Sequence, residues 1–247
     1  MRFRSPQSII DEIKHLQEKY GIKEVAFWDD TFTLQKDRVY ELLRLMKENK
    51  LNIIWSAQAR ADKVDRELLR AMKEAGCWKL HIGIESLVQK NLDMIKKGTT
   101  VEQNCNAVRL SKEAGIEVEA SFIFGIPGET FEDGLKTIEL LKTLDIDYAR
   151  FFSLTPYGEL QAKLQEYGKL LTNDLSKFQG NEIVFVPYSM SQQELEKLIS
   201  IAYTQFYFRT NYIFKRIKKL ASWRTFRDSV RGARAVYMIA TKGAGKV

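Results

Sequence analysis

The chain has 247 residues, 45% of them apolar, and a formal net charge of +7, a size that suits one or two domains with a sizeable core. No run of about 18 uncharged apolar residues occurs, and the first residues lack the apolar segment of a signal peptide, so we predict a soluble cytoplasmic protein without a membrane-spanning helix. Two cysteines and two histidines are too few for a zinc or iron–sulfur site built from this chain alone.

Helical and strand patterns alternate along the first two thirds of the chain. Apolar residues at helical spacing follow Ser5 and stop at Gly21, which predicts a helix over 6–19 with Ser5 as its N-cap. Strand patterns begin near positions 23, 53, 79, 117 and 148, with helical patterns between them. Steps of roughly 30 residues are typical of βαβ units, so we predict a parallel sheet curled into a full or partial barrel.

The segment 118–130 has the clearest boundary signals. An apolar run ends at Phe124 and is followed by Gly-Ile-Pro-Gly, which a strand cannot continue through, and Thr130 can cap a helix that starts at Phe131. The pattern predicts a strand, a sharp loop with exposed backbone N–H groups and a helix. Ligands bind at such strand ends in α/β proteins.

Polar residues and glycine occur where the predicted strands end. Because the carboxyl ends of parallel strands line one mouth of a barrel, we expect these residues to form a site for a zwitterionic ligand that carries hydroxyl groups. They are Asp29 and Asp30, Gln58 and Arg60, Glu85 and Ser86, Gly125 to Glu129 with Pro127 between them, and Ser153 and Thr155.

Structural alternatives exist for several of these residues. Asp29 and Asp30 could cap the next turn, and Arg60 could pair with Asp62 at the surface. For Glu85 a functional role is the favoured interpretation, because an unpaired carboxylate at the end of an apolar strand would be costly to bury. His81 and the two cysteines are interpreted as packed residues rather than ligands.

The last third of the chain is less regular and strongly basic. We predict a C-terminal helical appendage over 159–240 that includes a short helix at 160–167, a strand at 183–186 and a long helix capped by Ser189 or Ser191, followed by a disordered tail over 241–247. Residues 201–247 contain 11 lysines and arginines but one acidic residue, Asp228. The aromatic and basic side chains of 203–234 favour a helix with one apolar and one solvated basic face. The alternative is a surface that binds RNA or an anionic lipid.

An ordered set of short motifs resembles the radical S-adenosylmethionine (SAM) superfamily, and most closely its class with an upstream cobalamin-binding domain. The motifs are Trp28-Asp29-Asp30-Thr31-Phe32-Thr33, Gly76-Cys77, Gly83-Ile84-Glu85-Ser86, Ala114-Gly115-Ile116, Phe124-Gly125-Ile126-Pro127-Gly128-Glu129-Thr130 and Thr155-Pro156-Tyr157-Gly158. The resemblance implies a partial parallel (β/α) TIM-type barrel over 1–158 that lacks its first strand. After Thr155-Pro156 the fit is imperfect, because the family often has Pro-Gly-Thr there.

The resemblance also implies roles for residues and cofactors. Asp29 and Asp30 would receive the methionine ammonium of SAM, Gln58 and Arg60 would be third-strand polar contacts, and Glu85, with Ser86 beside it, would lie near the ribose or methionyl group. Ile123, Gly125 and Pro127 would flank adenine, together with Ser153 on the last strand. The complete enzyme would carry a 4Fe-4S cluster, could carry cobalamin, and would take electrons from a reductant such as flavodoxin or ferredoxin.

One departure from the family is large, because the Cys-x3-Cys-x2-Cys loop that holds the cluster is absent. We therefore expect an N-terminally truncated fragment that is inactive alone. It would belong to an enzyme of methyl transfer, cyclisation or another radical modification whose substrate the sequence does not specify. The competing hypothesis is a non-catalytic remnant, or a nucleic-acid or anionic-surface binding module that uses the basic tail.

Overall fold

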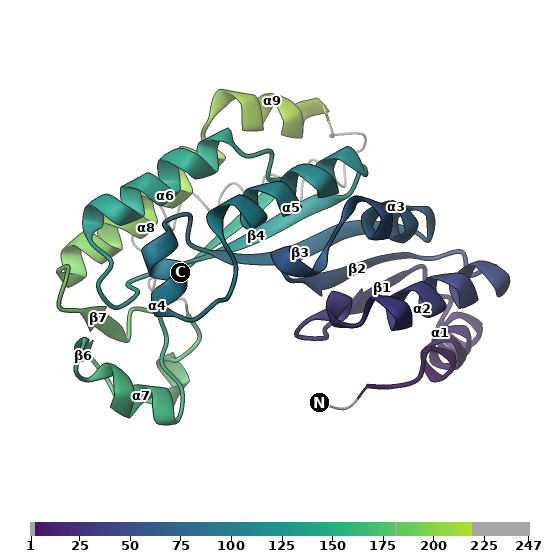
Figure 1. Cartoon of the computed structure of the whole chain (residues 1–247), viewed down its shortest axis with the longest axis horizontal. Helices are drawn as coiled ribbons and strands as arrows, with labels where there is room; N and C mark the ends of the chain where they lie inside the picture. Colours follow the sequence, from purple (N-terminus) through teal and green to yellow (C-terminus); the bar gives the residue numbers. More distant parts are fainter. Residues whose placement is uncertain (1–2, 181, 219–247) are drawn as a thin grey trace. The chain divides into compact units, whose positions relative to one another are not determined.

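A computed structural model describes residues 3–180 and 182–218 (Figure 1). The first two thirds alternate between helices and strands: α1 Pro6–Tyr20, β1 Glu24–Phe27, α2 Lys36–Glu48, β2 Ile54–Ala59, α3 Arg66–Glu74, β3 Cys77–Glu85, α4 Gln89–Met94, α5 Val101–Glu113, β4 Glu117–Phe124, α6 Phe131–Thr143 and β5 Tyr148–Ser153. The remaining elements are α7 Glu159–Leu164, β6 Gly168–Leu170, β7 Phe185–Pro187, α8 Gln192–Tyr207 and α9 Thr210–Lys218. None of these described helices is long and apolar enough to cross a membrane.

Strands β1 to β5 form one parallel sheet in the order β1-β2-β3-β4-β5, which confirms the predicted α/β class. Strand β1 pairs with β2 from Glu24 opposite Ile54 to Phe27 opposite Ala57, and the pairing of β2 with β3 is interrupted by a bulge between Trp55 and Ser56. Within the described residues β1 and β5 do not pair with each other, so the sheet is open, as a partial barrel requires. A separate antiparallel pair, β6 with β7, was not predicted as such from the sequence.

The described residues divide into two compact units. The first comprises the residues up to Ile84, Glu102–Ala120 and Asp145–Tyr148. The second comprises Glu85–Val101, Ser121–Leu144 and the residues from Ala149 onward. The predicted boundary at residue 158 stays a prediction, and the predicted tail over 241–247 lies outside the described residues.

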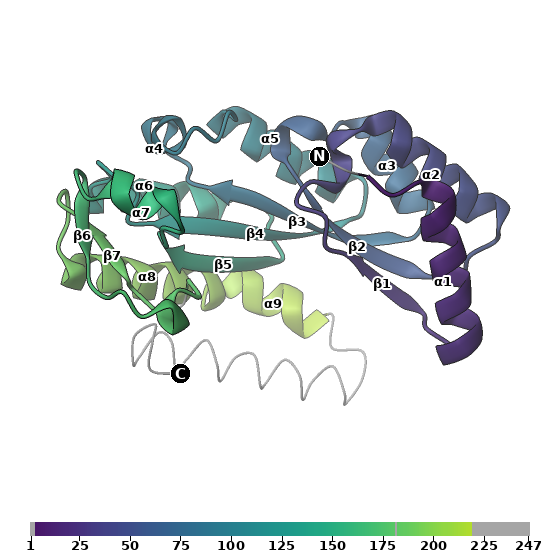
Figure 2. The ribbon, with the colours of Figure 1, turned by 90° about the horizontal axis from the view of Figure 1, so that it is seen from below.

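The first unit begins with the helix that local signals predicted. Ser5 Oγ accepts a hydrogen bond from the Ser8 N–H, and Gly21 ends α1 in the left-handed conformation. In Figure 2, α2, α3 and α5 lie on the same side of the strands of this unit. Fully buried side chains fill the space between these helices and the strands: Leu42, Trp55, Leu68, Leu69, Met72, Leu80 and Ile82.

Gly76 precedes β3 and offers a test of this packing. Its φ is +95°, and a Cβ atom added there would lie 2.5 Å from the carbonyl oxygen of Ile53. We expect Gly76→Ala to lower the free energy of unfolding by about 2 kcal/mol or more, because left-handed strain adds to a backbone clash. Gly21→Ala is the matched control, since φ there is +63° but no atom lies within 4 Å of the added Cβ. Urea unfolding followed by circular dichroism measures both, and equal losses would contradict the prediction.

The second unit is built on aromatic packing and on a close contact between two helices. Phe151 of β5 contacts Phe122, Tyr203 and Phe206, with ring centroids 5.5, 4.9 and 6.2 Å away. Helices α6 and α8 approach so closely that a Cβ on Gly134 would lie 2.2 Å from Leu198 Cδ2. Helix α8 therefore helps to form the core of this unit.

The long C-terminal helix predicted from the sequence is two helices. Of the two predicted caps, Ser191 caps α8, with Glu194 completing a capping box. Helix α8 ends at Tyr207 and α9 starts at Thr210, while the Arg209 guanidinium lies over the Phe206 and Tyr212 rings. Phe206 and Tyr212 are thus buried in packing, whereas Phe208 and Phe214 are exposed. The predicted basic tail beyond Lys218 lies outside the described residues.

Candidate functional site

The polar groups at the strand ends of the first unit differ in whether another side chain binds them. Asp29 and Asp30 follow β1 as exposed residues, and neither carboxylate has a hydrogen bond or ion pair among the residues the structure describes. They do not cap the next turn, whose N-cap is Thr31. Arg60, after β2, donates from Nε and Nη2 to the Asp62 carboxylate at 3.0 and 3.3 Å, as its structural alternative predicted. Gln58 is half-buried and lies opposite His81 of β3.

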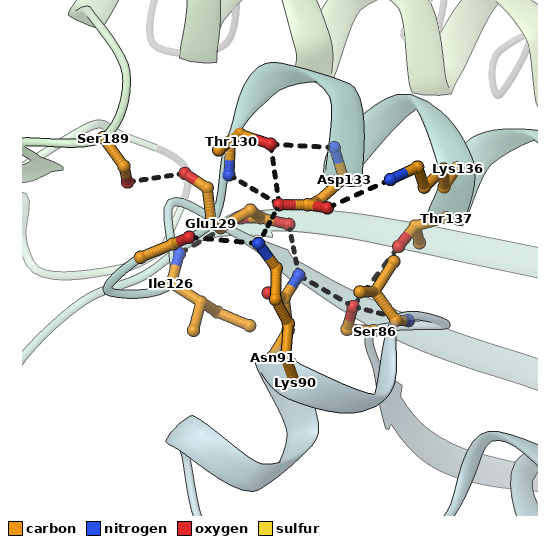
Figure 3. Close-up of polar contacts among 12 residues, drawn as sticks. Ser86, Lys90, Asn91, Ile126, Glu129, Thr130, Asp133, Lys136, Thr137 and Ser189 are labelled. Carbon is orange, nitrogen blue, oxygen red and sulfur yellow. Dashed lines mark hydrogen bonds and ion pairs between the residues drawn. The ribbon is translucent and has the colours of Figure 1, made fainter.

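In the second unit, the loop after β4 closes around the carboxylate of Glu129 (Figure 3). The Glu129 side chain is fully buried, and its Oε2 accepts hydrogen bonds from the N–H groups of Gly125 at 2.7 Å and Ile126 at 3.1 Å. Its Oε1 accepts from Asn91 Nδ2 at 3.0 Å. Burial raises the pKa of Glu129 to about 7, although the two backbone hydrogen bonds act in the opposite direction.

This geometry corrects the prediction of exposed backbone donors in the loop. The first two N–H groups after β4 are buried and bonded to Glu129, so they are not available to a ligand. The left-handed backbone of Gly125 (φ +81°) allows the fold-back, and an added Cβ would lie 3.1 Å from Leu195 Cδ2. The loop therefore holds its shape through the side chain of its own acidic residue.

Asp133 anchors the helix that follows. It forms a capping box with Thr130, as the sequence predicted for that cap position, and an ion pair with Lys90 Nζ at 2.5 Å. Burial alone would raise the pKa of Asp133, but the hydrogen bonds from Lys90 and Thr130 hold it well below its usual value. The start of α6 is therefore tied to α4.

Ser86, at the end of β3, joins the same network. Its Oγ shares a hydrogen bond with Thr137 Oγ1 at 3.3 Å and accepts from Asn91 Nδ2 at 3.2 Å (Figure 3). Ser86 is fully buried. Asn91 therefore connects the end of β3 with the loop after β4, and the Ser86 hydroxyl serves this connection.

Glu85, the preceding residue, has an unusual backbone. Its φ is +62°, in the left-handed region that residues other than glycine rarely adopt, and Lys97 Nζ lies 2.6 Å from its Oε1. The Glu85 side chain is 14% exposed. The ion pair with Lys97 removes the reason for function given from the sequence, an unpaired buried carboxylate. Strained backbone is concentrated at functional sites, so a role for Glu85 stays a prediction.

The remaining predicted site residues lie on β4, on β5 and in the loop after β4. Ile123 is half-buried and Pro127 is buried. Ser153 is buried and its Oγ donates to the Glu182 carbonyl oxygen at 2.9 Å. The Leu154 N–H donates to the Phe124 carbonyl oxygen at 2.8 Å, which brings the ends of these two strands together.

A second polar cluster lies in the first unit and was missed in the sequence. Glu119 Oε2 of β4 lies 3.0 Å from Lys79 Nζ and 3.2 Å from His81 Nδ1, both on β3. His81 is therefore a partly exposed residue in contact with a carboxylate, and its interpretation as a packed core residue is wrong. The signal was present, because polar residues alternate with apolar ones at 79, 81, 117 and 119, as on a strand with one polar face.

The cysteines of this chain do not fit an iron–sulfur cluster. Cys77 is buried, which raises the pKa of its thiol to about 12. Cys105 is half-buried on α5, and burial raises its thiol pKa as well. No group of three histidine, cysteine or acidic side chains that could hold a metal occurs within the described residues. A ligand set of three thiolates is therefore not available from this sequence.

Comparison with known proteins gives a consistent result. The family model of the radical SAM superfamily matches residues 1–141. An uncharacterized methyltransferase of Pyrococcus horikoshii is 36% identical over 240 residues, which are 96% of this chain and 52% of that protein. The anaerobic magnesium-protoporphyrin IX monomethyl ester cyclase of Rubrivivax gelatinosus is 28% identical over 86% of this chain and 39% of its own length.

A solved structure shows the same fold. The radical S-adenosylmethionine methyltransferase TsrM from Kitasatospora setae, with cobalamin and a 4Fe-4S cluster bound, superposes with a TM-score of 0.61 at 24% identity. The match covers 84% of this chain and 42% of TsrM. The chain thus spans about half the length of the proteins it matches, or less.

Proposed function

This chain belongs to the radical SAM superfamily, and on that premise we propose that it is the SAM-binding α/β region of a radical SAM enzyme. The family implies SAM and a 4Fe-4S cluster as cofactors. The observation that carries the proposal is the family match over 1–141, the region that contains the predicted strand ends from Asp29 to Pro127. Because the residues of this chain do not fit the cluster, we propose that its thiolates come from polypeptide outside this sequence and that this chain alone is inactive.

Methyl transfer or cyclisation is the reaction class that we propose. The support is the similarity to a methyltransferase and to a cyclase. A cobalamin cofactor, carried by a part outside this sequence, belongs to the same proposal, since TsrM binds cobalamin. When bound, SAM and the cluster supply a carbon radical, and the residues of this chain would bind and orient the SAM molecule.

The roles of individual residues follow the motif positions. The free carboxylates of Asp29 and Asp30 suit an ammonium group, because charge-assisted hydrogen bonds favour such pairs. A ligand carboxylate at Arg60 would compete with Asp62. We assign Gln58 to the third-strand polar contact, Glu85 and Ser86 to the ribose or methionyl side, and Ile123, Gly125, Pro127 and Ser153 to adenine.

SAM binding by the metal-free chain tests the proposal. We expect weak binding, detected by saturation-transfer NMR of the SAM adenine protons, and about a tenfold weaker affinity in the Asp29→Asn, Asp30→Asn double variant, because two charge-assisted contacts are lost. Asp37→Asn, an exposed acid in the first turn of α2, is the matched control. Equal binding by the double variant and the control would contradict the assignment of Asp29 and Asp30. A dissociation constant below about 1 µM would contradict the proposal that the cluster supplies part of the site.

A further inference from the structure

The polar cluster of the first unit lies on one face of the sheet. Leu80 and Ile82 of β3 are fully buried, whereas Lys79 and His81 are partly exposed, and α2, α3 and α5 lie on one side of the strands (Figure 2). Side chains alternate along a strand, so Lys79 and His81 are on the side opposite the two buried residues. Glu119 reaches both of them from β4. An acidic group, a basic group and an imidazole thus lie together on the face of the strands opposite Leu80 and Ile82.

The geometry of the cluster determines which atom of His81 is available. The side chains of Glu119, Lys79 and His81 are 7, 17 and 23% exposed. Burial alone would raise the pKa of Glu119, but the hydrogen bonds from His81 and Lys79 lower it to about 2, so its carboxylate is ionised. It therefore accepts the Nδ1–H of His81. No described residue bonds to Nε2, which in this tautomer has a lone pair and can accept a hydrogen bond.

Trp28 flanks the imidazole from the end of β1. The Trp28 and His81 ring centroids are 6.1 Å apart with an interplanar angle of 36°, too close for another ring to fit between them. The Trp28 side chain is 70% exposed, so much of the indole remains open to a further planar group. A large exposed aromatic side chain beside a polarised imidazole is an unusual surface for a residue with only a packing role.

We propose that Trp28 and His81 form a subsite for a planar heteroaromatic group that carries an N–H donor. The group stacks on the part of the Trp28 indole that the imidazole leaves open and donates its N–H to His81 Nε2, while Glu119, itself paired with Lys79, holds the imidazole through Nδ1. This inference rests on the proposed function only in assigning the group to the substrate. The Trp28 stacking surface selects for an aromatic ring, and Nε2 selects for the donor.

Indole and 1-methylindole are matched probes, because they differ in the N–H group alone. We expect saturation-transfer NMR titrations of the whole chain, without SAM, to show indole binding about threefold to tenfold more tightly than 1-methylindole, the range that one neutral hydrogen bond contributes. His81→Phe should remove that difference, and His81→Gln, which keeps an acceptor, should retain part of it. Trp28→Ala should weaken the binding of both probes. Tyr20→Ala, at a side chain that is 64% exposed in the same unit, is the control.

Two outcomes would overturn the proposal: equal affinity of the wild-type chain for the two probes, or unchanged binding by Trp28→Ala. Circular dichroism spectra of each variant show whether it is folded. Because the titration contains neither SAM nor a cluster, its failure would leave the SAM-binding experiment unaffected. Failure of SAM binding would likewise leave this subsite unaffected.

Discussion

Replacement of Glu129 by alanine is expected to lower the free energy of unfolding by about 3 kcal/mol, because buried donors that lose their acceptor cost about 1–3 kcal/mol each. The N–H groups of Gly125 and Ile126 would lose their acceptor, and the Asn91 amide would keep only Ser86 Oγ. Urea unfolding at pH 7 followed by circular dichroism measures the loss. Glu132→Ala, at an exposed position in the first turn of the same helix, should cost less than about 1 kcal/mol. A similar loss in both variants would refute the role of Glu129.

The dependence of stability on pH separates the effect of ionising Glu129 from the effect of the shape of its side chain. The folded-state pKa of Glu129, about 7, lies above the ordinary value of 4.5, so the folded protein favours the protonated acid. Its contribution to stability is complete below pH 4.5 and is lost as the pH rises through 7. Glu129→Gln keeps the shape and cannot ionise, so it should gain stability relative to the wild type by roughly 2–3 kcal/mol between pH 5 and pH 8. A difference that stays constant over this range would show that Glu129 does not titrate there.

Glu119→Gln should have the second large effect, with the opposite dependence on pH. At pH 7 we expect a loss of about 2–3 kcal/mol, because the ammonium of Lys79 keeps its partly buried position without its anionic partner. The folded-state pKa of Glu119, about 2, lies below the ordinary value of 4.5, so its contribution is present above pH 4.5 and is lost as the pH falls through 2. The difference between wild type and variant should therefore shrink by about half at pH 3.

Urea unfolding at pH 7 and pH 3 tests this prediction. Glu48→Gln is the control, since it breaks an exposed ion pair with Arg44 and should change stability by less than about 1 kcal/mol at either pH. A difference between wild type and Glu119→Gln that grows as the pH falls would show that the cluster is not held by an ionised Glu119.

Elements with local signals at both ends were predictable from the sequence. The helix between Ser5 and Gly21 and the strand, loop and helix around Thr130 have the predicted positions, because caps, glycine and proline act within a few residues of themselves. The break between α8 and α9 was not predictable, since the apolar spacing continues through it. Arg209 lies over aromatic rings there, which is a tertiary contact rather than a local signal.

The candidate site was predictable in its position along the chain but less so in its contacts. Glu129 resembles an ordinary acid at a helix start, and nothing in the spacing shows that it folds back onto Gly125. Its partner Asn91 is 38 residues away, and Lys79 is 40 residues from Glu119. Contacts over such separations depend on how the strands align, which a single sequence does not specify. The pairing of Arg60 with Asp62 was predictable because the two residues are close neighbours.

The contact between Ser189 and the strand-end loop limits how this protein can be shortened. Ser189 Oγ donates to the Glu129 carbonyl oxygen at 2.6 Å, just before α8 packs on α6 at Gly134. An excised version that stops before β7 would lose this hydrogen bond and leave the α6 face and Phe151 without their cover. Expression trials of shortened versions should therefore keep the chain through Tyr207, because the loop after β4 and α6 depend on contacts with Ser189 and α8.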